Sequence, residues 1–362
     1  MDELILRFPT IAMNVFKEID NEGLMKCKEV GHLWSNAVDN QKEVWIRRIR
    51  LRSENLKAFP KLWNSVISKT SVERVKELAL AIQKFFGENK FGTAEQFTPH
   101  HVVAAIGSKE LYEYIANKTG EFNKTLKHKS TALHYSAMYG NFEIVKFIVE
   151  NVEDVNPGDD CGITPLHAAA THGQLEVCKI ILDYVINKNP KRNTGDTVLH
   201  YAAQCDHFDI GKLIIDNISE KNPKGENEDT PLHWAASYGN HKFCTYILDN
   251  VTDKNPMNVT GNTPLHEAAM RGHLDICQII IPQVEDKNPS NNIGMTPLHY
   301  AAKEGHFGII NYMMDFVQDM HPLDNYGKTP QDYMKQFYAD LRKRMNPRVG
   351  TNSKLKKRKL QQ

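Results

Sequence analysis

The sequence lacks any long run of apolar residues, although apolar types make up 41% of its 362 residues. A helix that spans a bilayer needs about 20 such residues in succession, so the sequence predicts no membrane span. An excess of one charge is also missing, because 45 Lys and Arg stand against 44 Asp and Glu, for a net charge of +1. A protein without a strong overall field has no general attraction to nucleic acid or to an anionic membrane. We therefore expect neither as a partner.

Cysteine is scarce, with 6 in the chain, and the first residues, MDELILRF, lack the basic start and the long apolar segment of a secretory signal. We therefore expect reduced thiols in the cytoplasm or the nucleus. Cys178, Cys244 and Cys277 share one position relative to a periodic histidine, which predicts a small buried site. Cys205 lies at a position expected to be more exposed and is a candidate reactive thiol.

A periodic pattern is what the sequence has in abundance. Histidines recur every 33 residues, and prolines and glycines follow the same period. A fixed period of this length without insertions indicates stacked structural repeats. The periodic histidines are His101, His134, His167, His200, His233, His266 and His299.

Each repeat reads as two helices and a turn. The string TPLH occurs at 164–167, 230–233, 263–266 and 296–299. Threonine is a good N-cap, and proline suits the first helical position, where its missing N–H does no harm. Gly239 then ends the first helix of its repeat with a positive φ. Apolar residues from Phe243 to Leu248 predict a second helix, followed by an extended turn.

These motifs together resemble the ankyrin-repeat family from about Phe97 to about Ala339, in roughly eight repeats. The resemblance implies a mainly α solenoid that binds proteins, with histidines that bond backbone groups. The spacing of the histidines agrees with a structural role. Packed helices lie about 8–10 Å apart, whereas a metal ion needs ligand atoms within about 2.1 Å, so histidines of neighbouring repeats would be too far apart to share a metal ion. We expect no cofactor, no metal site and no small-molecule substrate. TPHH at the first repeat and TPQD at the last, with Asp332 at the histidine position, read as caps.

Several departures from the repeat pattern carry their own predictions. Asp206 replaces a helix-ending glycine and can adopt the left-handed conformation. Lys129 and Glu228 replace a glycine before the threonine, which predicts altered turns. Pro282 should stop or bend the helix in which it lies.

The N-terminal segment, residues 1–50, predicts a small helical bundle that resembles an F-box. The resemblance rests on an apolar-proline pair, an apolar helix before an Asp-containing turn, a Leu-x-x-Cys segment and a Val-x-x-x-Trp segment. It implies binding to the Skp adaptor of a cullin–RING ubiquitin ligase. The residues expected to bind the adaptor are Phe8, Pro9, Val15, Ile19, Leu24, Val30 and Trp34. Alternatively, this bundle packs on residues 51–96, which read as a helical linker that caps the first repeat.

The C-terminal tail, residues 340–362, is strongly basic and ends in KLKKRKLQQ, which contains the basic run KLKKRK. Such a run is typical of a nuclear import signal, and equally of a disordered, solvated tail. Both readings remain open, as does the choice between cytoplasm and nucleus.

The ankyrin resemblance places the target-binding surface on the inner helices and turn tips. On the inner helices the candidates are Met138, Tyr139, Thr171, His172, Gln204, Cys205, Ser237, Tyr238, Met270, Arg271, Lys303 and Glu304. At the turn tips they are Asp159, Arg192, Asn258 and Asn291. Tyr135, Tyr201, Trp234 and Tyr300 follow the histidines and are expected to pack partly between inner helices.

The resulting hypothesis is a substrate-recognition adaptor of a Skp–cullin–F-box ubiquitin ligase. Its repeats would hold an unknown target protein while its first residues bind the Skp adaptor. The alternative is an ankyrin scaffold or nuclear regulator independent of the ubiquitin system. No motif in the sequence combines a nucleophile, a general base and a group that orients the base, which argues against an enzyme.

Overall fold

The computed structural model describes residues 98–345. These residues belong to two compact units, divided between Asn187 and Lys188, and each unit is considered by itself. The F-box-like segment, the linker at 51–96 and the end of the basic tail lie outside the described residues.

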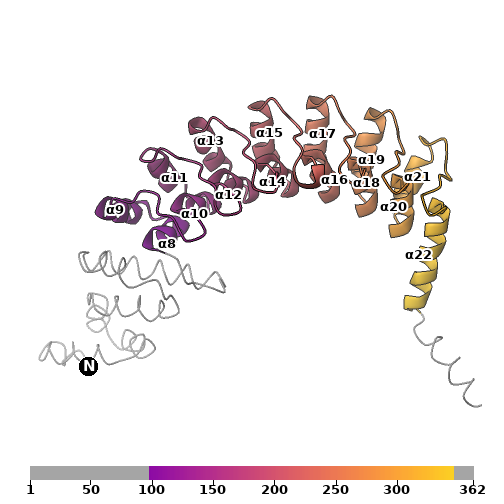
Figure 1. The fold of residues 1–362 in the computed structure, drawn as a ribbon, viewed down its shortest axis with the longest axis horizontal. Helices are drawn as coiled ribbons and strands as arrows, with labels where there is room; N and C mark the ends of the chain where they lie inside the picture. The colour runs from indigo at the N-terminus through magenta and orange to yellow at the C-terminus, as the bar shows by residue number, and fades with distance from the viewer. Residues whose placement is uncertain (1–97, 346–362) are drawn as a thin grey trace, which may run out of the picture. The chain divides into compact units, whose positions relative to one another are not determined.

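The described residues of the first unit, 98–187, form three pairs of helices. In each pair a short inner helix is followed by an outer helix (Figure 1). Inner helices pack on inner helices and outer helices on outer ones, in two layers. The inner helices are α8 (Pro99–Ile106), α10 (Ala132–Met138) and α12 (Pro165–Thr171). The outer helices are α9 (Lys109–Thr119), α11 (Phe142–Val149) and α13 (Leu175–Tyr184).

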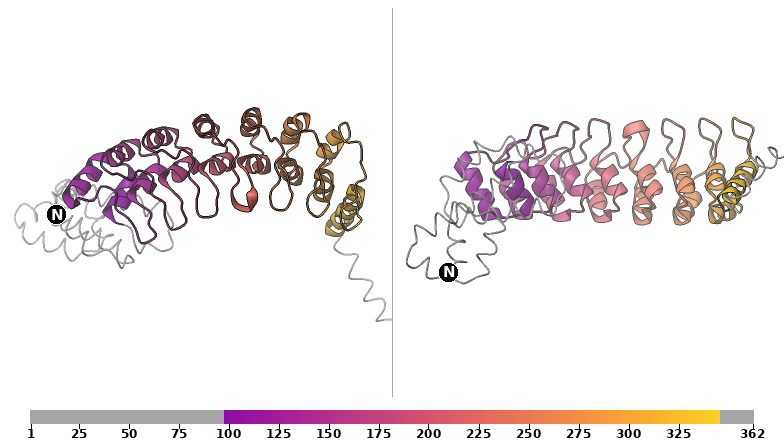
Figure 2. Two further views of the ribbon diagram at one scale, coloured as in Figure 1. Left: turned by 45° about the horizontal axis from the view of Figure 1, so that its top comes forward. Right: turned by 90° about the horizontal axis from the view of Figure 1, so that it is seen from below.

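The second unit repeats this arrangement and ends on an unpaired helix. Its inner helices are α14 (Val198–Gln204), α16 (Pro231–Tyr238), α18 (Pro264–Arg271), α20 (Pro297–Glu304) and α22 (Pro330–Met345). Its outer helices are α15 (Phe208–Asp216), α17 (His241–Asn250), α19 (Leu274–Ile280) and α21 (Phe307–Met313). Two 3-10 turns add to these, η1 (Glu226–Glu228) and η2 (Ile281–Gln283). Within each unit the long turns between repeats extend to one side of the helices (Figure 2).

Helix α16 shows how the repeat motif produces its helix. Thr230 is extended at the N-cap, with φ −109° and ψ 164°, and Pro231 takes the first helical position. Gly239 ends the helix with φ 78°, and its N–H donates to the carbonyl of Ala235. These positions confirm the predicted start and stop signals.

The core of each repeat combines small residues on the inner helix with larger residues on the outer helix. Ala235 and Ala236 are fully buried on α16, where small side chains let α17 approach closely, and Phe243 and Ile247 on α17 are buried as well. The predicted small buried site is confirmed for the three shared cysteines, Cys178, Cys244 and Cys277. One such pair of helices cannot cover its own apolar face, so stacking on neighbours completes each core.

Asp206 takes the expected left-handed conformation, whereas Lys129 and Glu228 keep the positive φ and the turn hydrogen bond of the glycines at their position, so the turn at Lys129 is not altered as predicted. Asp206, Lys129 and Glu228 all have positive φ, between 57° and 62°. Helix α19 ends at Ile280, and Pro282 lies in the 3-10 turn that follows. One boundary differs from the sequence analysis, because α22 continues to Met345 and the first residues assigned to the tail are helical.

The mainly α fold with ankyrin-like helix pairs is thus confirmed. Within residues 98–345 there is no β-strand, and only isolated bridges join Thr125 to Thr131 and Lys191 to Thr197. None of the helices in this range combines the length and apolarity needed to cross a membrane.

Candidate protein-binding surface

The periodic histidines join one repeat to the next. From Thr131 to Thr296, the N–H of the N-cap threonine in each repeat donates to the Nδ1 of the histidine three residues later, at 3.0–3.2 Å. Because Nδ1 accepts, we place the ring proton on Nε2, where it is donated to a backbone carbonyl 29 residues later. These donor–acceptor pairs are His134–Ile163, His200–Asp229, His233–Asn262, His266–Met295 and His299–Lys328, at 3.0–3.1 Å.

Burial keeps these imidazoles neutral. It lowers the pKa of His200 and of His266 from 6.5 to about 4, and it lowers the pKa of His134, His233 and His299 as well. A neutral ring is required here, because a proton on Nδ1 would face the threonine N–H that this nitrogen accepts. The histidines therefore build the stack, as the sequence analysis expected. In residues 98–345 no group of three or more potential ligand side chains gathers where a metal ion could bind.

The last repeat replaces its histidine with a carboxylate. Asp332 Oδ2 accepts from the N–H of Thr329 at 3.2 Å and from its hydroxyl at 2.9 Å. These hydrogen bonds lower the pKa of Asp332 to about 2. Asp332 thus caps its own helix and needs no carbonyl from a following repeat, which agrees with its predicted role at the end of the array.

A second set of bridges was missed by sequence reasoning. The residue before an outer helix reaches back, in five repeats, to the end of the inner helix of the preceding repeat. His273 Nε2 lies 3.1 Å from the carbonyl of Ser237, and His306 Nε2 lies 3.2 Å from that of Met270. Asn141, Gln174 and Asn240 make equivalent contacts. Since these positions vary in residue type, their common role is visible only in three dimensions.

Most predicted target-binding residues on the inner helices are accessible. They lie on the last turn of these helices or just after it, where the side chains point away from the core. His172, Arg271, Lys303, Glu304 and two tyrosines, Tyr139 and Tyr238, are exposed. Half-buried are Met138, Thr171, Gln204, Cys205, Ser237 and Met270.

Two of these residues have a defined environment. Gln204 Nε2 donates to the hydroxyl of Tyr238 at 2.8 Å, which links two neighbouring inner helices. Burial raises the pKa of the Cys205 thiol, which disfavours the reactive thiolate. This environment offers no support for the reactive-thiol prediction.

Three of the predicted tip residues make bonds within their own turns. Asp159 Oδ1 accepts from the N–H groups of Cys161 and Ile163, and Asn258 Oδ1 accepts from those of Thr260 and Asn262. Arg192 instead pairs with buried Asp196, at 3.2 Å. These three of the four predicted tip residues are half-buried.

Asn291 is a correction to the predicted tip set. Its side chain is 7% exposed, and its Oδ1 accepts from the N–H of Ile293 and of Met295. Its Nδ2 donates to Asn262 Oδ1 at 2.8 Å. Asn291 therefore has a structural position inside the turn, where a partner would not reach it.

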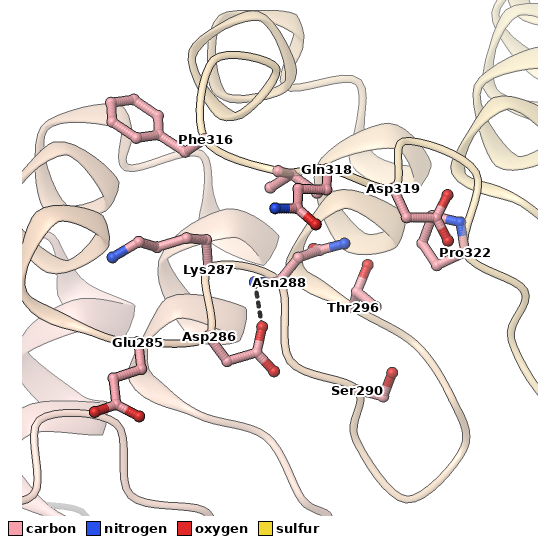
Figure 3. Close-up of a pocket in the computed structure, with 11 residues that line it drawn as sticks. Glu285, Asp286, Lys287, Asn288, Ser290, Thr296, Phe316, Gln318, Asp319 and Pro322 are labelled. Carbon is pink, nitrogen blue, oxygen red and sulfur yellow. Dashed lines mark hydrogen bonds between the residues drawn. The ribbon is translucent and has the colours of Figure 1, made fainter.

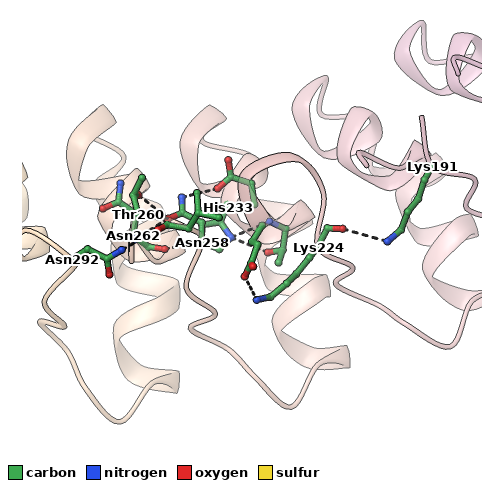
Figure 4. Close-up of polar contacts among 11 residues, drawn as sticks. Lys191, Lys224, His233, Asn258, Thr260, Asn262 and Asn292 are labelled. Carbon is green, nitrogen blue, oxygen red and sulfur yellow. Dashed lines mark hydrogen bonds and ion pairs between the residues drawn. The ribbon is translucent and has the colours of Figure 1, made fainter. Parts of the chain in front are cut away.

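Backbone hydrogen bonds connect the tips of consecutive turns. The N–H of Val259 donates to Asn227, that of Asn292 to Thr260, and that of Asn325 to Ile293, at 2.9–3.1 Å. Side chains add to them: Asn292 Nδ2 donates to the Val259 carbonyl, and Lys191 Nζ to the Lys224 carbonyl (Figure 4). Rigid tips of this kind offer a partner a preorganised surface.

The last turns of the second unit also expose apolar side chains that the sequence analysis missed. Their exposed fractions range from 41% to 72%. They belong to three consecutive tips and are Met257, Val259, Ile293, Leu323 and Tyr326. Exposed apolar residues at neighbouring tips are typical of protein-contact surfaces.

The aromatic residues that follow the histidines pack between inner helices, as expected. Tyr135 lies edge-on to His101, Trp234 to His200 and Tyr300 to His266, with ring centroids 5.3–6.0 Å apart. Tyr300 is buried, and the other two are half-buried. These rings serve the stack first and contribute only their outer edges to the surface.

A pocket of about 410 Å³ lies between two loops that follow the outer helices α19 and α21 (Figure 3). Its carboxylates serve their own loops, because Asp286 accepts from the N–H of Asn288 and Asp319 from that of His321. Lys287 Nζ donates to the carbonyl of Val284. Its polar groups therefore do not converge on one point, and the pocket offers no catalytic arrangement.

The geometry defines a class of protein: a repeat stack with structural histidines and a preorganised contact surface. Family profiles for ankyrin repeats match residues 64–159, 151–225, 217–291 and 293–323. These matches cover more than half of the chain, which belongs to the ankyrin-repeat family. Ankyrin repeats are protein-interaction modules and typically non-enzymatic scaffolds, so binding to a protein partner is the function of this region.

Structure comparison agrees on the fold. The crystal structure of the human ASB11 ankyrin repeat domain matches with a TM-score of 0.53 and 19% sequence identity. The match covers 59% of this chain and 97% of that domain. No curated protein sequence matches the chain.

Proposed function

We propose that the chain is a substrate-recognition adaptor of a Skp–cullin–F-box ubiquitin ligase. The observation that carries the proposal is an order within one chain: F-box-like residues from Phe8 to Trp34, a spacer, and then an ankyrin-repeat stack. The first segment would bind the Skp adaptor, and the repeats would bind the target. Joining both in one chain raises the concentration of target at the ubiquitin-transfer enzyme.

An incomplete core is the physical reason to expect a partner at the N-terminal segment. A bundle of roughly 40 residues buries too little apolar surface to be stable alone. Phe8, Pro9 and Val15 would complete that core against the Skp adaptor. The target would bind where the inner helices and turn tips leave side chains accessible, as at Tyr139, Tyr238 and Arg271.

Charged residues at the start of the chain should abolish capture of the ligase. Pro9→Asp with Val15→Asp should lower the recovery of Skp and cullin by at least about tenfold, because an unpaired charge buried in an interface costs several kcal/mol. Affinity purification of the full chain with quantitative mass spectrometry measures this. Asn311→Asp, exposed on outer helix α21, is the charge control.

Two results would contradict the adaptor proposal. One is the absence of Skp and cullin from complexes of the intact wild-type chain. The other is unchanged recovery with the charged variant, which would show that Phe8, Pro9 and Val15 are not the contact surface.

A nuclear regulator independent of the ubiquitin system is the second candidate, favoured by the basic run KLKKRK. Deletion of residues 354–359 should shift a fluorescent fusion of the full chain from nucleus to cytoplasm, because import receptors recognise clustered Lys and Arg. Replacing Gln361 and Gln362 with alanine is the control. An unchanged distribution after the deletion would favour the solvated-tail reading.

A further inference from the structure

A small pocket lies on the inner surface of the second unit, between α16 and α18. Its volume is about 240 Å³, below the roughly 300–1,000 Å³ of sites for whole small molecules. This size fits one long side chain. The pocket is lined by Asp229, His233, Trp234, Ser237, Tyr238, Glu267 and Arg271.

In the second unit, one repeat departs from the aromatic pattern at the position after its histidine, and the pocket lies there. Trp234 and Tyr300 each place a ring against the histidine of the preceding repeat. Glu267 occupies the equivalent position on α18, so no ring covers His233, which lines the pocket instead. The carboxylate of Glu267 thus takes the place of an aromatic ring at the base of an accessible pocket.

Two carboxylates face this recess, and neither forms a close ion pair within the described residues. Asn262 Nδ2 donates to Glu267 Oε1 at 3.1 Å, and Asn258 Nδ2 donates to Asp229 Oδ1 at 2.8 Å. Among residues 98–345 no Lys, Arg or His nitrogen lies within 4.0 Å of either carboxylate. Burial raises the pKa of Glu267 and nearby Asp229 raises it further, while the Asn262 hydrogen bond and the charge of Arg271 lower it in part. A bound cation would relieve both effects.

Aromatic rings form the walls and are held in place. Trp234 packs edge-on against Tyr201 as well as His200, with its ring centroid 5.8 Å from that of Tyr201. Tyr238 is 54% exposed, and its hydroxyl accepts from Gln204. Tryptophan and tyrosine faces attract cations, and a planar guanidinium stacks on them while its N–H groups reach carboxylates.

Arg271 lines the same pocket but does not neutralise it. Its side chain is exposed, and it forms no ion pair with Glu267 within 4.0 Å. One solvated guanidinium against two carboxylates leaves the recess with an excess of negative charge. Arg271 therefore leaves room for a further cation.

We propose that this pocket binds one arginine side chain of the target protein, with its guanidinium between Trp234 and Tyr238 and hydrogen-bonded to Glu267 and Asp229. The inference rests on the target-binding half of the proposed function and is independent of the Skp adaptor. Arginine fits better than lysine, because its planar fork of five N–H donors can serve two carboxylates and stack on a ring at once.

The experiment uses the indole signal of Trp234 in the full chain. With nitrogen-15-labelled tryptophan, the 4 tryptophans of the chain give separate N–H signals in a two-dimensional NMR spectrum, and Trp234→Phe identifies the relevant one. The probe is acetyl-Gly-Arg-Gly-amide. The same peptide with citrulline, a neutral group of the same shape, and the same peptide with lysine are the comparisons.

We expect a saturable shift of the Trp234 signal with the arginine peptide and an affinity about tenfold lower for the citrulline and lysine peptides. Glu267→Gln, which keeps size and shape, should weaken arginine binding about tenfold. Glu285→Gln is the control, since it removes an exposed carboxylate elsewhere in the same unit. Circular dichroism verifies that both variants are folded.

Several outcomes would overturn the inference. These are no saturable shift with the arginine peptide, equal affinity for the citrulline or lysine peptide, or unchanged binding by Glu267→Gln. The titration contains no ligase component, so its failure is distinct from failure of the adaptor proposal. Arginine binding without Skp capture would retain the pocket and discard the adaptor.

Discussion

Acidification should progressively destabilise the second unit between about pH 6.5 and about pH 4. Burial lowers the pKa of His200 and His266 to about 4, whereas an unfolded histidine titrates near 6.5. As the pH falls, the unfolded chain therefore binds protons before the native chain does. The stability that these residues contribute is fully present above about pH 6.5 and is lost below it.

The magnitude follows from linkage. Each such histidine adds about 1.4 kcal/mol per pH unit to the slope within this window, so two of them remove several kcal/mol before pH 4.5. Domains are stable by only about 5–15 kcal/mol. Urea unfolding at a series of pH values, followed by circular dichroism, measures the slope.

Variants separate this cause from general acid unfolding. His266→Gln should be less stable at neutral pH, yet its slope should be shallower by about 1.4 kcal/mol per pH unit. His241→Gln alters an exposed histidine and should follow the wild-type profile. A free energy of unfolding that stays constant between about pH 6.5 and pH 5 would contradict this account.

Gly211→Val should be strongly destabilising, although valine is the better helix former. A Cβ atom at Gly211 would lie 2.1 Å from two ring carbons of Phe243. Other repeats carry Val145, Cys178 or Ile310 at this position and a smaller residue in place of Phe243. Overpacking costs about 1–3 kcal/mol, more than the gain in helix propensity of up to about 1 kcal/mol.

Gly211 and Phe243 can be tested together in a double-mutant cycle. Phe243→Ile alone should cost about 2 kcal/mol, because it leaves a cavity above Gly211. The double variant restores the combination seen in other repeats and should recover most of the loss, a coupling of about 2 kcal/mol. Thermal and urea unfolding of the four proteins give the cycle. Simple addition of the two losses would show that the residues do not compensate each other.

Much of the repeat architecture could be predicted because its determinants are local in sequence. Threonine, proline and glycine at fixed offsets define the inner helix, and Gly239 and Asp206 end their helices as expected. The position of Pro282 likewise marked the end of α19. Such signals depend on backbone conformation, which a few neighbouring residues determine.

Contacts between repeats were harder to predict. Asn141, Gln174 and His273 differ in type but reach the same backbone carbonyl of the preceding repeat, that of the fourth residue after the histidine. The turn asparagine Asn291 looked exposed in the sequence, yet its side chain closes the turn from inside. The pocket beside Glu267 arises from a ring that is missing there, which only the packed neighbours reveal.

The carboxylate at Asp332 has a consequence for how long such an array can be. A histidine at this position donates to a backbone carbonyl of the next repeat. A chain that ended after an interior repeat would therefore leave the imidazole N–H without an acceptor in the protein. Asp332 satisfies its threonine within one module. A Thr-Pro-x-Asp sequence can therefore end such an array. Placed in an earlier repeat, it would let a shorter protein end there without an unpaired imidazole N–H.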